Sequence, residues 1–301
     1  ITQAMTSKRP TKEELHSIIN IKNLKVGHFI QDAEPVSRLT NIEFLDLSDS
    51  KIDDLSPLYG LHNLKSLNVR NTEVSDLAPL SNLKNLKELN IENTNVKSLQ
   101  ALHELSNISK IYADGSKLTQ DEVVALKRKQ RQLTVIYQTD DLRLWWGNLD
   151  MAWREIFNSH LTCNSNPTAE QLQSIVDLEE IVVDPNNVVY SLESLQQMSF
   201  LRKLIINNNQ IHDLTPLSDK DLLEVLSVSG NPVDDITPLS NLLLLKNLNV
   251  ENTQVSDLTP ITNLKNIKVL NIGGTSVRNL KPLAGFEHLE DLSIVNTYVK
   301  S

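Results

Sequence analysis

The sequence is poor in the residues that several classes of protein depend on. Among 301 residues there is one cysteine, Cys163, so no disulfide forms within the chain and no CxxC zinc or redox motif is present. Aromatic residues make up 4% and glycine occurs eight times, so a core must be built from aliphatic side chains. No apolar run approaches the roughly 18–20 residues of a membrane span, and the opening ITQAMTSKRP lacks the apolar region of a signal peptide. This fits a cytosolic protein, or a mature or trimmed product of an exported one.

The charge balance argues against binding to nucleic acid. The net charge is −9 and the pI is near 5.3, whereas a nucleic-acid surface needs clustered basic residues to displace counterions. One basic run, residues 127–131, lies close behind Asp121 and Glu122. We interpret this run as the solvated face of a helix rather than as a phosphate-binding track.

What the sequence does contain is a repeat. Residues 68–86 (NVRNTEVSDLAPLSNLKNL) and 249–267 (NVENTQVSDLTPITNLKNI) agree at thirteen of nineteen positions. Aliphatic anchors recur every 22 residues, at Leu45, Leu67, Leu89 and Ile111, and again at Leu204, Leu226, Leu248, Leu270 and Leu292. The frame around each anchor is LxLxx(N/T/S)x(I/V)xxLxPLxxLxxL. A unit of this size buries its aliphatic residues only by stacking on its neighbours, which predicts a solenoid.

Each part of the frame predicts a local structure. The LxL segment alternates as a half-buried strand does, so stacked turns should form a parallel sheet. The (N/T/S) position should form a polar ladder that satisfies buried main-chain groups at the end of each strand. Ser-Pro and Thr-Pro pairs, such as Thr215-Pro216, should start a short helical turn on the opposite side, with the hydroxyl as the cap.

The frame resembles the leucine-rich repeat, in particular the 22-residue repeats of the internalin-like bacterial subclass. The resemblance covers residues 24–118 and 181–299. It implies an α/β solenoid of two leucine-rich-repeat arrays, with one parallel strand per turn and short helical turns on the convex side. The sequence departs from the family where Thr or Ser replaces the usual Asn, and at Lys220, which occupies an inward aliphatic position. We expect a local distortion there, with Leu222 or Leu223 taking the site.

Two matching cap segments divide the chain. Thr11 with Glu14, and Thr168 with Gln171, are capping boxes that should begin a helix before each array. The sequence therefore predicts a first array over residues 1–138, a Trp-rich helix and linker over 139–166, and a second array over 167–301. A third capping box at Thr119 and an alternating segment over 133–137 predict a helix and strand that form a lid on the first array. The second array has no counterpart of this lid. We expect its C-terminal end to be covered by further chain, by a partner or by self-association.

Within the Trp-rich segment, apolar residues recur at helical spacing. Its apolar residues are Leu142, Trp145, Trp146, Leu149, Trp153, Ile156 and Phe157. They fit one helix, used either as an aromatic docking site or, the interpretation we favour, for packing between the arrays or onto the start of the second.

No catalytic, cofactor-binding or metal-binding residues emerge from the sequence. The seven histidines are scattered and none has the HExxH spacing. The acidic pairs Asp53-Asp54 and Asp234-Asp235 occupy equivalent repeat positions, which favours a structural role at a turn over calcium. Gly273-Gly274 falls at a strand-to-turn junction, where close packing is the better interpretation.

The outward residues of the strands should line the concave face, the usual binding face of such solenoids. In the first array this face is charged, and in the second it carries Ile205, Val225, Val269 and Val295. Arg and Tyr are enriched at protein interfaces. We therefore favour one candidate contact patch in the first array; the alternative is an unselected solvated face. Its residues are Arg70, Glu92, Lys110, Tyr112 and Asp114.

These observations favour a non-catalytic module that binds a protein partner through its concave face. The family resemblance implies a bacterial secreted or surface protein. Two alternatives remain: an intracellular, cytoplasmic regulatory subunit similar to phosphatase-regulating leucine-rich-repeat proteins, and a carbohydrate-binding adhesin. The few concave aromatics, chiefly Phe44 and Tyr112, give the adhesin little support.

Overall fold

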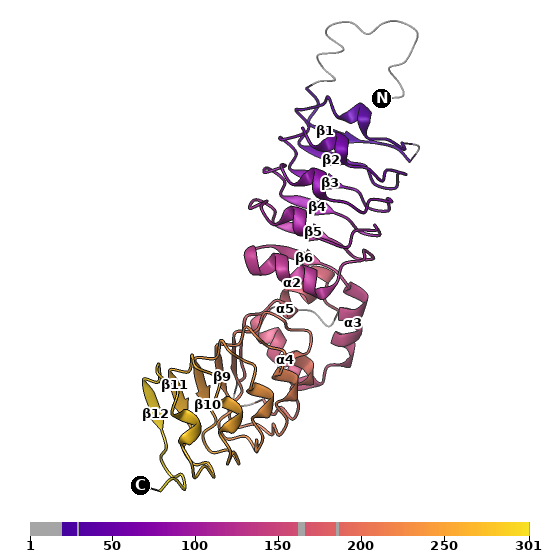
Figure 1. Ribbon diagram of the computed structural model, residues 1–301. Coiled ribbons are helices and arrows are strands. Elements are labelled where there is room, and N and C mark those ends of the chain that lie inside the picture. The colour runs from indigo at the N-terminus through magenta and orange to yellow at the C-terminus, as the bar shows by residue number, and fades with distance from the viewer. Residues whose placement is uncertain (1–19, 29, 162–165, 185–186, 301) are drawn as a thin grey trace, which may run out of the picture. The chain divides into compact units, whose positions relative to one another are not determined.

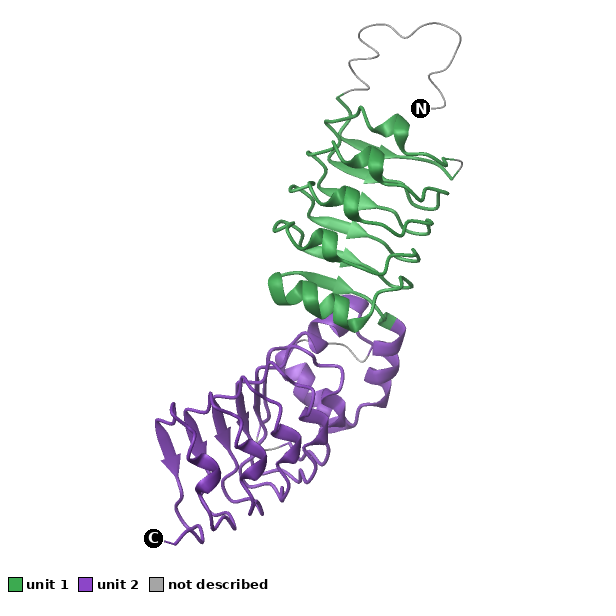
Figure 2. Ribbon diagram, viewed as in Figure 1, with its two compact units in different colours: residues 1–139 green, residues 140–301 purple. Residues whose placement is uncertain are grey.

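A computed structural model describes residues 20–28, 30–161, 166–184 and 187–300 (Figure 1). The chain forms two compact units, residues 1–139 and 140–301 (Figure 2). Each unit has its own parallel sheet and its own aliphatic core.

The first sheet has six parallel strands stacked in sequence order. Leu45, Leu67, Leu89 and Ile111 pair with one another across it, so the 22-residue spacing becomes the strand register. The strands are β1 (Asn23–Lys25), β2 (Phe44–Asp46), β3 (Ser66–Asn68), β4 (Glu88–Asn90), β5 (Lys110–Tyr112) and β6 (Thr134–Ile136).

The second sheet also has six parallel strands in sequence order, and Leu204, Leu226, Leu248, Leu270 and Leu292 are paired in the same way. The strands are β7 (Glu180–Val182), β8 (Lys203–Ile205), β9 (Val225–Ser227), β10 (Asn247–Asn249), β11 (Val269–Asn271) and β12 (Asp291–Ser293). The predicted fold class, an α/β leucine-rich-repeat solenoid, is confirmed.

Except between β5 and β6, the chain returns from one strand to the next in the same sheet through a three-residue 3-10 helix. In the first unit these are η1 (Glu34–Val36), η2 (Ser56–Leu58), η3 (Ala78–Leu80) and η4 (Gln100–Leu102). In the second they are η5 (Glu193–Leu195), η6 (Thr215–Leu217), η7 (Thr237–Leu239), η8 (Thr259–Ile261) and η9 (Lys281–Leu283).

The predicted capping of these helices by Ser and Thr hydroxyls is wrong in the Ser-Pro and Thr-Pro turns. The residue before each helix makes no side-chain cap there. Instead an aspartate two residues upstream accepts the first helical N–H: Asp54 Oδ1 from Ser56 N at 2.8 Å, and Asp213 Oδ1 from Thr215 N at 2.7 Å. Carboxylates suit this role because they accept strongly and their charge favours a helix N-terminus. The structural role expected for the acidic pairs is confirmed, since Asp235 caps Thr237 N in the same way.

The polar ladder at the strand ends is confirmed. Thr72 donates its hydroxyl to the Val69 carbonyl at 2.6 Å, within its own turn. Asn231 does more: its amide donates to the Ile206 and Val228 carbonyls, and its oxygen accepts from Ile211 N at 3.0 Å. An asparagine therefore ties two turns together, whereas threonine satisfies one carbonyl.

A second ladder occupies a backbone position with positive φ. Asp49, Asn71 and Asn93 hold φ between 53° and 58°, which short polar side chains tolerate. Asn71 donates to Asp49 at 2.6 Å and Asn93 donates to Asn71 at 2.7 Å. Gly274 holds the same position in the second unit at φ 65°, where an added Cβ would lie 2.1 Å from Asn252 Oδ1. This close approach and the positive φ explain the second glycine of the Gly273-Gly274 pair.

The local distortion expected at Lys220 is wrong. The backbone keeps the repeat geometry, with Lys220 N donating to the Leu217 carbonyl as Leu83 N does to Leu80. The lysine itself fills the inward position and is 1% exposed. Its aliphatic stem packs in the core, while Nζ reaches the Gln196 carbonyl at 3.2 Å and Asp219 Oδ1 at 2.8 Å.

Helices adjoin both arrays. Helix α2 (Gln120–Lys129) and strand β6 end the first sheet, and Thr119 accepts from Glu122 N at 3.4 Å. Helix α5 (Ala169–Val176) precedes the second sheet with the reciprocal Thr168–Gln171 capping box. The corresponding box at Thr11 and Glu14 lies outside the described residues, as does Cys163.

The Trp-rich segment forms two helices rather than the single one predicted. Helix α3 (Thr139–Asn148) ends before Asp150, which caps helix α4 (Met151–His160) by accepting from Trp153 N at 2.8 Å. The aromatic side chains belong to the core of the second unit, where Trp153 and Phe157 are fully buried. Trp153 Nε1 donates to the Ser191 carbonyl at 2.9 Å, so the ring is fixed to the first turn of that unit.

The last turn of the second unit is more open than the others. Leu292 is 41% exposed and Ile294 38%, whereas the equivalent Leu270 and Ile272 are buried. Within the part of the chain that the structure describes, every helix is too short or too polar to cross a bilayer.

Candidate functional site

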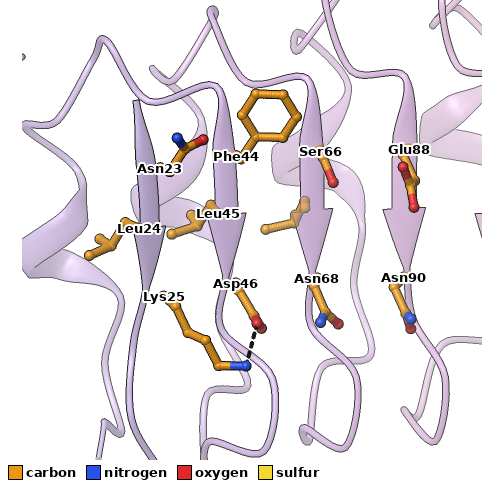
Figure 3. A pocket seen from close by; sticks show the side chains of 11 residues that line it. Asn23, Leu24, Lys25, Phe44, Leu45, Asp46, Ser66, Asn68, Glu88 and Asn90 are labelled. Atoms are coloured by element: carbon orange, nitrogen blue, oxygen red, sulfur yellow. Dashed lines mark ion pairs between the residues drawn. The ribbon is translucent and has the colours of Figure 1, made fainter. Parts of the chain in front are cut away.

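The outward-facing residues of the first sheet surround a hollow in its concave face (Figure 3). The hollow has a volume of about 540 Å³ and lies over β1 to β4. Because inward residues of each strand are committed to the core, the alternate residues are presented together on this face. The lining residues are Asn23, Leu24, Lys25, Phe44, Leu45, Asp46, Ser66, Leu67, Asn68, Glu88 and Asn90.

Phe44 is the one large aromatic side chain among these lining residues, and it is 48% exposed. It stands between Asn23 and Ser66, its partners in the strand register. The ring therefore has polar neighbours on both sides instead of an apolar cluster to pack into. A large exposed apolar side chain in a concave polar setting is typical of an interface anchor.

An ion pair joins β1 to β2 on the same face, at the other end of the strands from the Phe44 ring (Figure 3). Lys25 Nζ lies 2.9 Å from Asp46 Oδ2, and Asp46 Oδ1 accepts from Ser48 N at 3.0 Å. Partial burial works to raise the pKa of Asp46, but the hydrogen bonds from Ser48 and Lys25 outweigh it and the pKa is lowered. The hydrogen bond to Asp46 in turn raises the pKa of Lys25. Both groups are charged at neutral pH and held in place.

Two asparagines continue the polar floor of the hollow. Asn68 Oδ1 accepts from Arg70 N at 3.0 Å and Asn90 Oδ1 accepts from Glu92 N at 2.9 Å. Each side-chain oxygen is thus occupied by the backbone two residues on, which fixes the amide plane. Because these amides are already held in place, a binding partner would not have to pay the conformational entropy of ordering them.

Glu43 lies one residue before β2 and joins two turns. Lys22 Nζ lies 2.7 Å and Lys65 Nζ 2.5 Å from its two carboxylate oxygens. These two hydrogen-bonded ammonium groups hold the pKa of Glu43 at about 2.

The structure places the five residues of the predicted contact patch on three consecutive turns. Arg70 Nε lies 3.7 Å from Glu92 Oε2, and Lys110 Nζ lies 5.6 Å from the Tyr112 ring centroid. Asp114 is engaged differently. Its two oxygens accept from the backbone N and the hydroxyl of Thr139, at 2.8 and 2.6 Å, at the start of α3.

Sequence reasoning missed the hollow itself. It noted Phe44 as an outward aromatic but did not include Asn23 or Lys25 in the face. Leu24 and Leu45 are 21 residues apart rather than 22, yet they pair in register, so β1 extends the sheet by one strand. That near-repeat was the available signal.

The concave face of the second unit is more aliphatic. Val182 is 46% exposed and pairs in register with Ile205, which is half-buried. Val225 is half-buried and Val295 is 66% exposed. Among the described residues of both units, no group of three or more His, Cys, Asp or Glu side chains is placed to hold a metal ion.

Comparison with known proteins identifies the repeat. The family model for leucine-rich repeats matches residues 62–119 and 199–241. A comparison with curated proteins gave no significant match.

Several solved structures are similar to the chain. An internalin of Listeria monocytogenes is 23% identical over 96% of this chain and 91% of its own, with a TM-score of 0.40. Internalin C2 of the same organism is 20% identical over 86% of this chain and 83% of its own, with a TM-score of 0.35. A leucine-rich-repeat protein of Leptospira interrogans is 16% identical over 95% of this chain and 75% of its own, with a TM-score of 0.36.

The residues that the family model matches include strands β3 to β5 of the first sheet and β8 and β9 of the second. The prediction made from the repeat is confirmed: the chain contains leucine-rich repeats, which the family model matches at residues 62–119 and 199–241 and which stack as two parallel sheets.

Proposed function

We propose that the chain is a non-catalytic module that binds a protein partner through the concave face of its first unit. Leucine-rich-repeat proteins generally mediate protein–protein interaction. The observation that carries the proposal is Phe44, an aromatic ring 48% exposed in a hollow of about 540 Å³.

The surroundings of Phe44 favour a protein over a small ligand. The hollow is an open surface on a sheet rather than an enclosed pocket, and it is lined by fixed polar groups. Protein interfaces combine a central aromatic anchor with a polar rim in this manner. The Lys25–Asp46 pair and the amides of Asn68 and Asn90 supply that rim.

The predicted contact patch extends the same face toward β5. In this proposal Arg70 and Glu92 contribute charge beside the asparagines, and Lys110 with Tyr112 contributes a second aromatic. Asp114 lies on the same face, but its carboxylate already accepts two hydrogen bonds from Thr139. We therefore expect its substitution to affect stability more than affinity.

The test is a selection for binding partners against the whole chain. Displayed protein fragments are selected on the wild type, and the affinity of each is measured for Phe44→Ala and for the triple variant Arg70→Ala, Glu92→Ala, Tyr112→Ala. Loss of an interface anchor typically costs about 2 kcal/mol or more. The dissociation constant should therefore rise at least about tenfold.

Tyr59→Ala is the matched control. Tyr59 is an aromatic residue of similar exposure, 53%, directly after η2 on the opposite side of the turn. Its substitution should leave the affinity unchanged. Partners whose affinity falls with Tyr59→Ala but not with Phe44→Ala would show that the convex side binds, and would refute the proposal.

We further propose that the protein acts outside a bacterial cell, as a secreted or surface protein. The support is the resemblance of its 22-residue repeat to the internalin-like subclass. The reading frame of the whole gene tests this. A signal peptide in that frame is the expected result, and a frame without one would favour a cytoplasmic protein.

A further inference from the structure

The two units carry very different net charges. Residues 1–139 contain 18 lysines and arginines and 17 aspartates and glutamates, a net charge of +1 with histidine neutral. Residues 140–301 contain 11 and 21, a net charge of −10. The negative charge of the whole chain therefore comes from the second unit. A field of this sign attracts cationic partners and repels nucleic acid and anionic membranes.

The concave face of the second unit shares this imbalance. Because side chains alternate along a strand, the face consists of the first and third residue of each strand from β7 to β12, with the residue two positions after each strand. Its charged residues are four carboxylates and one ammonium: Glu180, Asp184, Lys203, Glu251 and Asp291. The same positions of the first unit are nearly balanced, since four carboxylates there are joined by three cations, Lys25, Arg70 and Lys110.

The single cation of this face is already paired within the chain, because Lys203 Nζ lies 3.1 Å from Glu180 Oε2. The row of residues directly before the strands supplies no further positive charge. Its three carboxylates and three cations pair with one another across successive turns: Glu179, Arg202, Glu224, Lys246, Lys268 and Glu290. Among the residues that the structure describes, Glu251 and Asp291 have no ion pair, although Glu251 Oε2 accepts from the Asn271 amide at 3.2 Å.

Aliphatic side chains share the face with these carboxylates. Val182 on β7 pairs in register with Ile205 on β8, and Val225 on β9 is the diagonal neighbour of Ile205. Val182 is 46% exposed and the other two are half-buried. We call Val182, Ile205 and Val225 the concave apolar cluster. Contiguous exposed apolar residues mark interaction sites.

The carboxylates decide which partner suits the concave apolar cluster. Glu251 follows β10 and Asp291 opens β12, and three strand spacings, about 14 Å, separate β9 from β12. One partner surface that covers the cluster therefore also approaches both carboxylates and removes water from them. This desolvation is costly unless a cation or a hydrogen-bond donor takes the place of the water. Lysine or arginine side chains of the partner meet that condition, whereas an apolar or acidic surface does not.

We propose that the concave face of the second unit binds a basic protein. Aliphatic residues of the partner pack on the concave apolar cluster, and its lysines or arginines pair with Glu251 and Asp291. This is a second binding surface, and it does not depend on the hollow around Phe44.

The test uses a library of displayed protein fragments that spans both signs of net charge, selected on the whole chain. Each selected fragment is then measured against Val182→Ser, which removes an exposed aliphatic residue at the edge of the sheet. For fragments that bind this face, the dissociation constant should rise at least about fivefold. Those fragments should carry a net positive charge, and Phe44→Ala should leave their affinity unchanged.

A second variant tests the carboxylates. Glu251→Gln with Asp291→Asn neutralises both, and it should slow association of the same fragments at least about threefold, because charges at the edge of an interface act mainly on the association rate. Added salt should slow association with the wild type toward the rate of this variant. Tryptophan fluorescence from α3 and α4 checks that each variant keeps the second unit folded.

Asp234→Asn with Glu287→Gln is the matched control. It removes the same charge from two exposed residues of the same unit that lie between strands, off the concave face. Because distant exposed charges are screened, association should stay within about twofold of the wild-type rate.

The proposal is wrong under any of three outcomes. In the first, no selected fragment loses affinity for Val182→Ser. In the second, the fragments that do lose affinity are neutral or acidic. In the third, the control variant slows association as much as Glu251→Gln with Asp291→Asn, because the fragments would then recognise the overall charge of the unit rather than this face.

Discussion

Replacing the buried Lys220 with methionine should stabilise the second unit. Lys220 is 1% exposed and fills an inward position that Met198 fills, fully buried, in the preceding turn. Methionine matches the length of the lysine stem and carries no charge, so the packing of the stem is retained. The ammonium group is removed from a site where it makes two contacts, with the Gln196 carbonyl and with Asp219.

The size of the expected gain in the free energy of unfolding depends on whether water can reach those two partners. Asp219 has a side chain that is 72% exposed and Gln196 is exposed, so water can satisfy both after the substitution. Replacing a buried ion pair by apolar groups of similar volume stabilises a protein by about 1–4 kcal/mol. Only one member of this pair is buried, so we expect a gain of about 1–2 kcal/mol. For a unit of this size that is a rise of about 2–8 °C in melting temperature.

Tryptophan fluorescence during urea unfolding measures this effect selectively. All three tryptophans lie in α3 and α4 and belong to the core of the second unit. The Lys220→Met transition should move to higher urea. Lys220→Ala leaves a cavity in place of the stem. It should lower the free energy of unfolding by about 2 kcal/mol or more and so move the transition to lower urea.

Leu83→Met is the control, since it makes an inward methionine in the first unit. It should leave the fluorescence transition where it is. A Lys220→Met variant less stable than the wild type by about 1 kcal/mol would refute the reasoning. It would mean that the hydrogen bonds of the ammonium group outweigh the cost of burying it.

Three further predictions concern stability. Asn231→Ala should cost about 2–4 kcal/mol in urea unfolding followed by fluorescence, because the buried Ile206 carbonyl and Ile211 N–H lose the side-chain partner that Asn231 provides; the Val228 carbonyl still accepts from the backbone N of residue 231. The free energy of unfolding of the first unit, measured by circular dichroism, should fall as pH drops from 4.5 toward about 2. The pKa of Glu43 is about 2 in the folded unit and 4.5 in its ordinary state, so protonation of its carboxylate favours the unfolded state. Glu43→Gln should lessen this fall, and an unchanged pH profile would contradict the assignment. Gly274→Ala should destabilise by about 1–3 kcal/mol because of its positive φ and the 2.1 Å approach, whereas Gly60→Ala, with open space around it, should be nearly neutral.

The candidate site was only partly predictable from the sequence. Arg70 and Tyr112 could be placed on the concave face because strand residues alternate, and Lys220 could be recognised as an exception to the pattern. That Lys220 would stay inward was not predictable, because the outcome depends on whether its amine reaches a carbonyl one turn away. The capping aspartates were likewise missed, since a Ser-Pro or Thr-Pro pair by itself offers a hydroxyl cap and the better acceptor lies two residues earlier.

The sequence by itself determined the solenoid, because a 22-residue period of aliphatic residues has no other way to bury them than to stack turn on turn. It also determined the register, since each leucine meets its equivalent in the next turn. Only the tertiary structure decided which outward residues gather around a hollow and which lie exposed. The hollow around Phe44 is made of residues from four successive turns, and their exposure depends on what the neighbouring turns place beside them.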